Sequence, residues 1–164
     1  GLFGPCGYGF PSIIGAKIGN PDTPVVGFAG DGAFGISMNE MTSCGREEWP
    51  AITMVIFRNY QWGAEKRNSI LWYDNNFVGT ELNPDFSFAK VAEGCGLKGV
   101  AVTTQSELTS ALKEACDAQK QGVTIFIEVI LNQELGEPFR RDAMTAPVEV
   151  AGIDPDDMKP QQPA

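Results

Sequence analysis

Residues 25–35 read VVGFAGDGAFG, and residues 51–61 read AITMVIFRNYQ. In each stretch an apolar run typical of a buried strand ends at polar residues, which include Asp31 in the first and Asn59 in the second. Because parallel strands present their carboxyl ends at one edge of an open sheet, we expect these two side chains to converge there. A carboxylate and an amide oxygen at such an edge can bind a small hard cation of the kind that partners phosphates.

The glycines around Asp31 allow two interpretations. Gly30 and Gly32 let the backbone approach a phosphate closely, and the following helix would offer its N-terminus to the negative charge. With Gly35 they also match the dinucleotide fingerprint, in which Arg58 would suit a 2′-phosphate. Against that, the aspartate would face the pyrophosphate without a cation between them, and the second strand ends at Asn rather than a lone acid. A metal–diphosphate site is favoured; a dinucleotide site or a plain connecting turn are the alternatives.

Composition bounds the class of protein. The chain has 164 residues, 43% apolar and 20% charged, which fits one globular domain. Its net charge of −9 disfavours binding to nucleic acid or to anionic membranes. Glycines and Asp31 interrupt the most apolar run, so we expect no membrane span. The chain begins at Gly1 without Met or signal peptide, which suggests a piece of a longer protein cut at its amino end.

The cysteine and histidine content limits which catalytic groups, metal sites and disulfides this chain can form. The sequence contains no histidine, which excludes a histidine-based triad and histidine-ligated zinc within this chain. Its four cysteines show no CxxC spacing, so we expect buried free thiols and a reducing cytoplasm.

Strands and helices alternate along the chain, which predicts an α/β fold with a parallel sheet between two helical layers. The Thr104–Glu107 spacing predicts a capping box, while Asn83 and Pro84 are typical of a helix start, and Ile36 is expected to face the core. The predicted strands are 24–29, 51–57, 99–103 and 124–131, and the predicted helices are 11–19, 36–46, 84–95 and 105–121.

The GDG motif at 30–32, followed after a helix and a strand by Asn59, resembles the signature of thiamine-diphosphate-dependent enzymes. The opening GPCGYGFPSIIGAKIG is similar to the segment that precedes this signature in the acetolactate synthase and pyruvate decarboxylase group. NYQWGAEKRN and ELGEPFRRDA more specifically resemble the sulfoacetaldehyde acetyltransferases. The resemblance covers residues 1–147, which we expect to form the cofactor-binding domain, and residues 148–164 are expected to be a polar tail.

The resemblance implies a site for thiamine diphosphate and Mg²⁺. Asp31, Asn59 and the backbone carbonyl of Gln61 would bind the metal. Cys6 corresponds to the bulky residue that bends thiamine, although a small buried core residue is an equal alternative. Residues implied to contact the cofactor are Gly30, Asp31, Gly32, Ala33, Phe34, Asn59, Gln61 and Cys6.

By the same resemblance, the expected function is conversion of sulfoacetaldehyde and phosphate to acetyl phosphate and sulfite, with homo-oligomerisation. The glutamate that activates thiamine comes from another domain in this family, and no glutamate here matches it. Arg140 and Arg141 are candidates for binding a substrate anion, or alternatively form salt bridges. Glu65–Arg67 are substrate-facing or, as we favour, a solvated helix surface. An acetolactate synthase-like carboligase or decarboxylase, a non-catalytic subunit and an NADP-binding domain are alternative functions.

Overall fold

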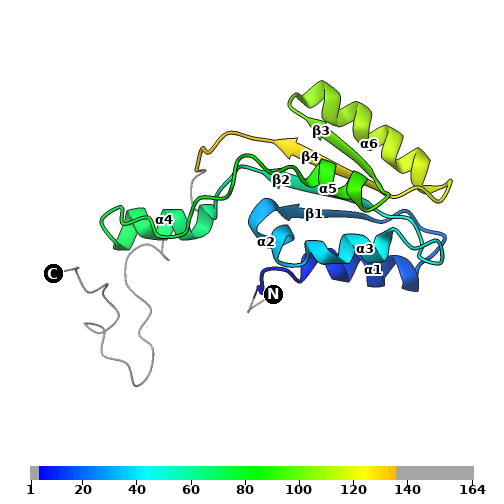
Figure 1. The fold of residues 1–164 in the computed structure, drawn as a ribbon, viewed down its shortest axis with the longest axis horizontal. Helices are drawn as coiled ribbons and strands as arrows, with labels where there is room; N and C mark the ends of the chain where they lie inside the picture. Colours follow the sequence, from blue (N-terminus) through cyan, green and yellow to red (C-terminus); the bar gives the residue numbers. More distant parts are fainter. Residues whose placement is uncertain (1–3, 136–164) are drawn as a thin grey trace, which may run out of the picture. The chain divides into compact units, whose positions relative to one another are not determined.

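The computed structural model describes residues 4–135, and the chain divides into two compact units (Figure 1). Within the described range, the first unit consists of residues 4–61 and 82–133, and the second of residues 62–81 together with 134 and 135. Within the described range, the first unit holds all the strands, and the second holds the single helix α4, Gly63–Trp72. No helix in residues 4–135 is long and apolar enough to cross a membrane.

The first unit is built on a parallel sheet whose strand order is β1-β2-β4-β3. The register places Gly30 beside Phe57 and Ile56 beside Glu128, so the strands end at a common edge. The strand positions expected from the apolar runs are confirmed to within two residues. The strand bounds are Val26–Gly30 for β1, Thr53–Arg58 for β2, Lys98–Val102 for β3 and Ile125–Ile130 for β4.

Helices cover both faces of the sheet, so the expected three-layer α/β fold is confirmed (Figure 1). The chain passes from β1 to β2 through helices on one face and returns from β3 to β4 through α6 on the other. Opposite directions on opposite faces are what right-handed crossovers require. One face carries α1 (Gly9–Gly19), α2 (Asp31–Ile36), η1 (Met38–Glu40), α3 (Met41–Cys44) and α5 (Phe88–Gly94); the other carries α6 (Gln105–Gln119).

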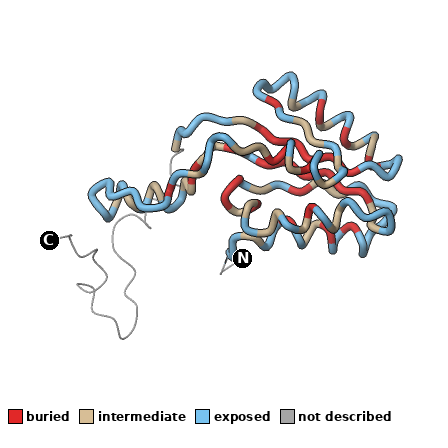
Figure 2. The backbone as a smooth tube through the Cα atoms, viewed as in Figure 1, coloured by how far each residue is buried: buried red, intermediate tan, exposed pale blue. Residues whose placement is uncertain are grey.

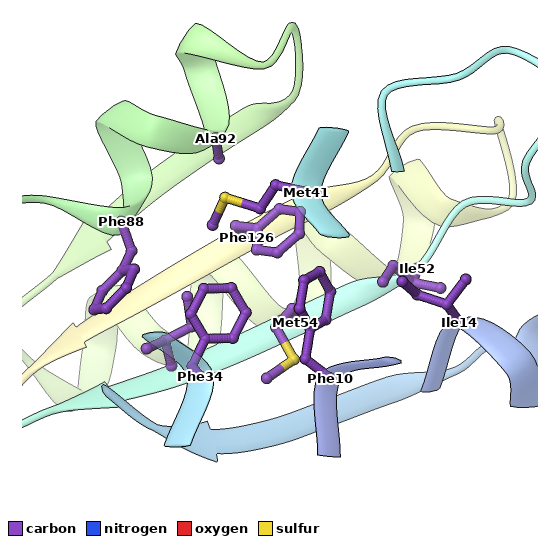
Figure 3. Packing of buried hydrophobic residues seen from close by; sticks show 10 residues of the cluster. Phe10, Ile14, Phe34, Met41, Ile52, Met54, Phe88, Ala92 and Phe126 are labelled. Carbon is purple, nitrogen blue, oxygen red and sulfur yellow. The ribbon is translucent and has the colours of Figure 1, made fainter. Parts of the chain in front are cut away.

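The buried residues follow the two faces, along the central strands (Figure 2). Beneath α6 the core is aliphatic, with Val55 and Ile127 at its centre. On the other face, Phe34 lies against Phe10, Phe88 and Phe126 at centroid separations of 4.8, 5.2 and 6.0 Å (Figure 3). This aromatic cluster fixes α2, and therefore the residue that begins it, against the sheet.

Two helix predictions were wrong in their bounds. The predicted helix 36–46 is divided at Ser37 into α2, η1 and α3, and Ile36 is exposed rather than inward-facing. The predicted helix 84–95 starts at Phe88, because Ser87 is the residue whose hydroxyl accepts the N–H of Lys90. The Asn83 side chain instead closes a turn by accepting the Asp85 N–H at 2.9 Å.

Other local predictions were confirmed. Helix α6 begins with the capping box, in which the Thr104 hydroxyl accepts the Glu107 N–H and the Glu107 carboxylate accepts the Thr104 N–H. The four cysteines are free, as expected, but they are less buried than expected: one is exposed and the others are partly buried. Burial, with Glu40 and Cys95 nearby, raises the pKa of Cys44 to about 12.

Candidate active site at the carboxyl edge of the sheet

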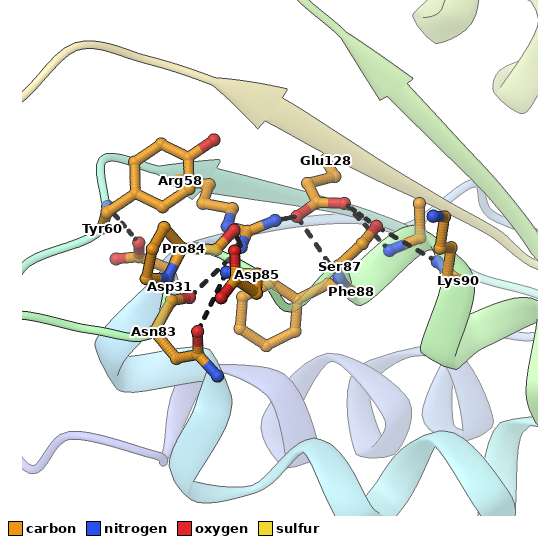
Figure 4. A network of polar contacts seen from close by, with 11 residues as sticks. Asp31, Arg58, Tyr60, Asn83, Pro84, Asp85, Ser87, Phe88, Lys90 and Glu128 are labelled. Atoms are coloured by element: carbon orange, nitrogen blue, oxygen red, sulfur yellow. Dashed lines mark hydrogen bonds and ion pairs between the residues drawn. The ribbon is translucent and has the colours of Figure 1, made fainter.

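The structure brings the ends of β1 and β2 together, as the sequence predicts. Asp31 follows the last residue of β1 and begins α2, while Asn59 follows the last residue of β2. A hydrogen bond joins the two strand ends, since the Tyr60 N–H donates to Asp31 Oδ2 at 2.7 Å (Figure 4). The carboxylate of Asp31 is thus held beside the turn that carries Asn59 and Gln61.

Asp31 is a buried carboxylate, and the hydrogen bonds that it accepts within the described residues come from backbone N–H groups. Its exposed fraction is 4%, and its Oδ1 accepts the Gly32 N–H at 2.9 Å. Burial raises the pKa of Asp31, and the N–H groups of Tyr60 and Gly32 oppose that effect. Within residues 4–135 no cationic side chain forms an ion pair with it. A buried anion with unused lone pairs fits a bound cation.

The turn after β2 has the backbone geometry of a specialised site. Tyr60 has φ = 62°, a conformation uncommon for a residue with a side chain. Gln61 is 2% exposed and donates from Nε2 to the Gln133 carbonyl at 3.0 Å, which ties the turn to the segment after β4. Its Oε1 accepts no hydrogen bond within the described part of the chain. The resemblance implies that the Gln61 backbone carbonyl, not this side chain, binds the metal, and that role stays a prediction.

The ligand set is poor in carboxylates and thiolates. No group of three or more His, Cys, Asp or Glu that could hold a metal occurs in residues 4–135. Asp31, an amide and a peptide carbonyl therefore offer one charge and oxygen donors only, a set suited to Mg²⁺ rather than to zinc. The residues present fit a magnesium diphosphate.

Helix α2 presents its N-terminus to the same edge. The N–H groups of Asp31, Gly32 and Ala33 precede the first intrahelical hydrogen bond. The Gly32 N–H donates to Asp31 Oδ1, so those of Asp31 and Ala33 remain for an anion. At Gly30 a Cβ would meet no atom within 4 Å, which leaves open space beside the backbone. Phe34 is predicted to contact the diphosphate through its backbone N–H, and that role stays a prediction. Its side chain is fully buried in the aromatic cluster.

Sequence reasoning missed the role of one ion pair. Arg58 Nη1 lies 2.5 Å from Glu128 Oε1, and both side chains are buried (Figure 4). An arginine already neutralised in this way is not free to bind a 2′-phosphate, which argues against the less favoured alternative of a dinucleotide site. Glu128 is the one charge in the apolar run of β4, and that was the signal in the sequence for a buried partner.

The remaining predicted site residues lie elsewhere or outside the described range. Cys6 is exposed, so its alternative as a buried core residue is wrong, and its contact with the cofactor stays a prediction. In α4, Glu65 is exposed, whereas Lys66 and Arg67 are partly buried and Lys66 pairs with Glu81 at 2.5 Å. Whether Glu65–Arg67 face the substrate or the solvent stays a prediction. Arg140 and Arg141 lie outside the described residues.

Several named proteins are similar in sequence to this chain over nearly its whole length. It is 77% identical over 162 residues to the "Probable sulfoacetaldehyde acetyltransferase" of Rhizobium meliloti (strain 1021), covering 99% of this chain and 27% of that protein. The sulfoacetaldehyde acetyltransferase of Roseovarius nubinhibens is 68% identical over 162 residues, with the same coverage. By contrast, the mitochondrial acetolactate synthase catalytic subunit of Saccharomyces cerevisiae is 36% identical over 115 residues, covering 70% of this chain and 16% of that protein.

Solved structures share the fold. The thiamine diphosphate-dependent 4-hydroxybenzoylformate decarboxylase of Rhodococcus jostii RHA1 matches with a TM-score of 0.71 and 30% identity, over 79% of this chain and 24% of that one. The chain thus spans about a quarter of the length of the proteins it matches. The family model described as "Thiamine pyrophosphate enzyme, C-terminal TPP binding domain" matches residues 1–129. This chain therefore belongs to the C-terminal cofactor-binding domains of the thiamine-pyrophosphate enzymes.

Proposed function

We propose that this chain supplies the diphosphate- and metal-binding half of a thiamine-diphosphate-dependent acetyltransferase. The full-length protein would convert sulfoacetaldehyde and phosphate to acetyl phosphate and sulfite. The buried carboxylate of Asp31, without a cationic partner in residues 4–135 and joined to the turn after β2, is the observation that carries the proposal. The relatives named for this reaction support the choice of substrates.

In this proposal each residue at the sheet edge has a separate task. Asp31 supplies the charged oxygen to Mg²⁺, Asn59 supplies an amide oxygen, and the Gln61 carbonyl supplies a third. The N–H groups of Asp31 and Ala33 at the start of α2 bind a diphosphate oxygen. Thiamine diphosphate, when bound, supplies the nucleophilic carbon for carbonyl chemistry, and the protein positions it.

The glutamate that activates the cofactor would come from outside this chain. Glu128 is the buried glutamate of the described residues, and the Ser87 hydroxyl, the N–H groups of Phe88 and Ala89, and Arg58 already occupy its carboxylate. A complete site accordingly needs another domain, and we propose a homo-oligomer in the cytoplasm that assembles it.

Sulfite release tests the proposal most directly. Full-length protein supplied with Mg²⁺, thiamine diphosphate, phosphate and sulfoacetaldehyde should release sulfite and form acetyl phosphate in equal amounts. Pyruvate is the discriminating substrate, because acetolactate formation without sulfite release from sulfoacetaldehyde would assign the protein to the carboligases. Failure to bind thiamine diphosphate would remove both assignments.

A further inference from the structure

Arg58 joins three parts of the first unit at the end of β2. Its Nη1 pairs with Glu128 on β4 at 2.5 Å, and its Nη2 donates to the Pro84 carbonyl at 3.1 Å (Figure 4). The exposed fraction of Arg58 is 4%, so these contacts are made away from solvent. A planar guanidinium can serve a carboxylate and a carbonyl at once, which a lysine ammonium cannot do with the same geometry.

Glu128, the partner of Arg58, is itself held in place by hydrogen bonds from the start of α5. Its Oε2 accepts the Ser87 hydroxyl at 2.7 Å and the Ala89 N–H at 3.1 Å, so the carboxylate also caps the start of α5. A carboxylate at a helix N-terminus is electrostatically favourable. The pair therefore has its remaining hydrogen-bonding capacity satisfied, as a buried ion pair requires.

The same arginine contacts the turn that holds Asp31. The guanidinium carbon of Arg58 lies 4.5 Å from the centroid of the Tyr60 ring, within the range of a cation–π contact. Tyr60 is the residue with φ = 62°, and its N–H is the donor to Asp31. Its carbonyl in turn accepts the Leu82 N–H at 2.8 Å. A left-handed conformation in an aromatic residue persists only where its surroundings enforce it.

We propose that Arg58, anchored by Glu128, is a positioning residue of the metal site. It holds the Tyr60 ring, and so keeps the Asn59–Gln61 turn in the conformation that orients Asp31 and Asn59 toward one cation. The inference rests on the proposed function, to which it adds an outer layer that fixes the metal ligands. Outer-layer partners of metal ligands commonly change affinity by about 10- to 100-fold.

The test compares variants of the full-length protein in two measurements. Calorimetric titration with Mg²⁺ at saturating thiamine diphosphate gives the metal affinity. Hydrogen exchange of the cofactor-free protein, read on a peptide covering residues 58–62, reports how firmly the turn is held. Arg58→Met should weaken Mg²⁺ binding about 10- to 100-fold and speed exchange of that peptide. Arg58→Lys, which keeps the charge, should weaken Mg²⁺ binding clearly with a smaller loss of melting temperature.

A buried polar group at the opposite end of the same sheet provides the matched control. The Gln119 side chain accepts the Val25 N–H at 2.7 Å and donates to Thr53 Oγ1 at 3.0 Å, at the start of β2. Gln119→Leu leaves buried polar groups unpaired and should lower the melting temperature, as Arg58→Met does. It should leave the Mg²⁺ affinity and the exchange of residues 58–62 unchanged.

Tyr60 variants test the route by which Arg58 acts. Tyr60→Phe keeps the ring and should bind Mg²⁺ like the wild type. Tyr60→Ala removes the ring, so it should weaken Mg²⁺ binding, and adding Arg58→Lys to it should cause little further loss. Additive losses in the double variant would overturn this route.

The outcomes separate the inference from the function on which it rests. Wild-type Mg²⁺ affinity in Arg58→Lys would contradict the positioning role of Arg58. So would a loss of Mg²⁺ affinity in Gln119→Leu equal to that in Arg58→Met. Both outcomes would leave the proposed function intact. A wild-type protein that binds neither Mg²⁺ nor thiamine diphosphate would contradict the proposed function. Hydrogen exchange in the cofactor-free protein would still decide whether Arg58 holds the turn.

Discussion

At the scale of single residues, the proposed metal site depends on one buried carboxylate. Asp31 lies where burial raises its pKa, and two N–H groups partly offset that cost. In the cofactor-free protein this carboxylate is therefore held in an unfavourable environment. A bound cation would offset that cost, which would favour metal binding at this position.

Replacing Asp31 provides the sharpest test of that view. Asp31→Ala in the full-length protein should weaken Mg²⁺-dependent thiamine diphosphate binding by more than the roughly 10- to 100-fold typical of outer-layer partners. Asp31→Asn keeps the shape but loses the charge, and should also bind weakly. Its cofactor-free melting temperature should fall, because an amide offers one oxygen to the two N–H groups of Gly32 and Tyr60. Titration with the cofactor checks the affinity, and wild-type affinity in both variants would remove Asp31 from the site.

Asn59 provides a milder comparison at the same edge. An amide oxygen is a neutral ligand, so Asn59→Ala should reduce Mg²⁺ affinity less than Asp31→Ala does. The same titration measures both variants. A loss larger than that of Asp31→Ala would mean that the turn after β2, rather than the carboxylate, contributes most to metal binding.

At the scale of elements, the helix starts show what the sequence can and cannot predict. The capping box of α6 depends on residues three positions apart, Thr104 and Glu107, so it was predictable. The start of α5 was predictable only in part: Ser87 accepts the Lys90 N–H three positions on, but Glu128, forty residues away, accepts the N–H of Phe88 at 3.3 Å. The convergence of Asp31 and Asn59 was predictable from two strand ends. The Arg58–Glu128 pair required knowing that β2 and β4 are neighbours.

The capping box of α6 predicts a pH dependence. Hydrogen bonds from the Thr103 N–H, the Thr103 hydroxyl and the Thr104 N–H lower the pKa of Glu107 below its ordinary value of 4.5. A lowered pKa in the folded state contributes stability above pH 4.5 that is lost as the pH falls through the folded-state pKa. Glu107→Gln should therefore have a lower melting temperature than the wild type at pH 7. The difference in melting temperature should shrink as the pH falls through the folded-state pKa of Glu107. A difference independent of pH would contradict the charge-based explanation.

The packing of α5 on β3 provides a test with a built-in control. A Cβ at Gly99 would lie 2.0 Å from the Ala89 carbonyl oxygen, so Gly99→Ala must push helix and strand apart. We expect it to destabilise the domain by about 1–3 kcal/mol or more. At Gly94, near the end of α5, an added Cβ would meet no atom within 4 Å. Gly94→Ala should therefore be neutral or stabilising. Thermal melting measures both, and equal effects would refute the close approach.

At the scale of the whole molecule, the sheet leaves an apolar area without a helical cover among the described residues. The rings of Phe28 on β1 and Phe57 on β2 stack at 6.1 Å, and Phe28 is 61% exposed. Phe28 and Phe57 follow Val26 and Val55 by two residues, so they lie on the same face of the sheet as the cluster beneath α6. Helix α6 itself packs mainly over β4 and β3. Because matched relatives are about four times as long, most of such a protein lies outside this chain.

The chain expressed alone should consequently fold without turning over substrate. Its strands and two hydrophobic clusters provide a core, but the activating glutamate would come from elsewhere and the Phe28–Phe57 area would face solvent. We expect no sulfite release, and concentration-dependent self-association by sedimentation velocity. Phe28→Ser should reduce that association, whereas Val123→Ser, a change at an exposed site before β4, should leave it unchanged. Sulfite release by the isolated chain would refute the divided site, and a monomer at every concentration would show that this apolar area does not drive association.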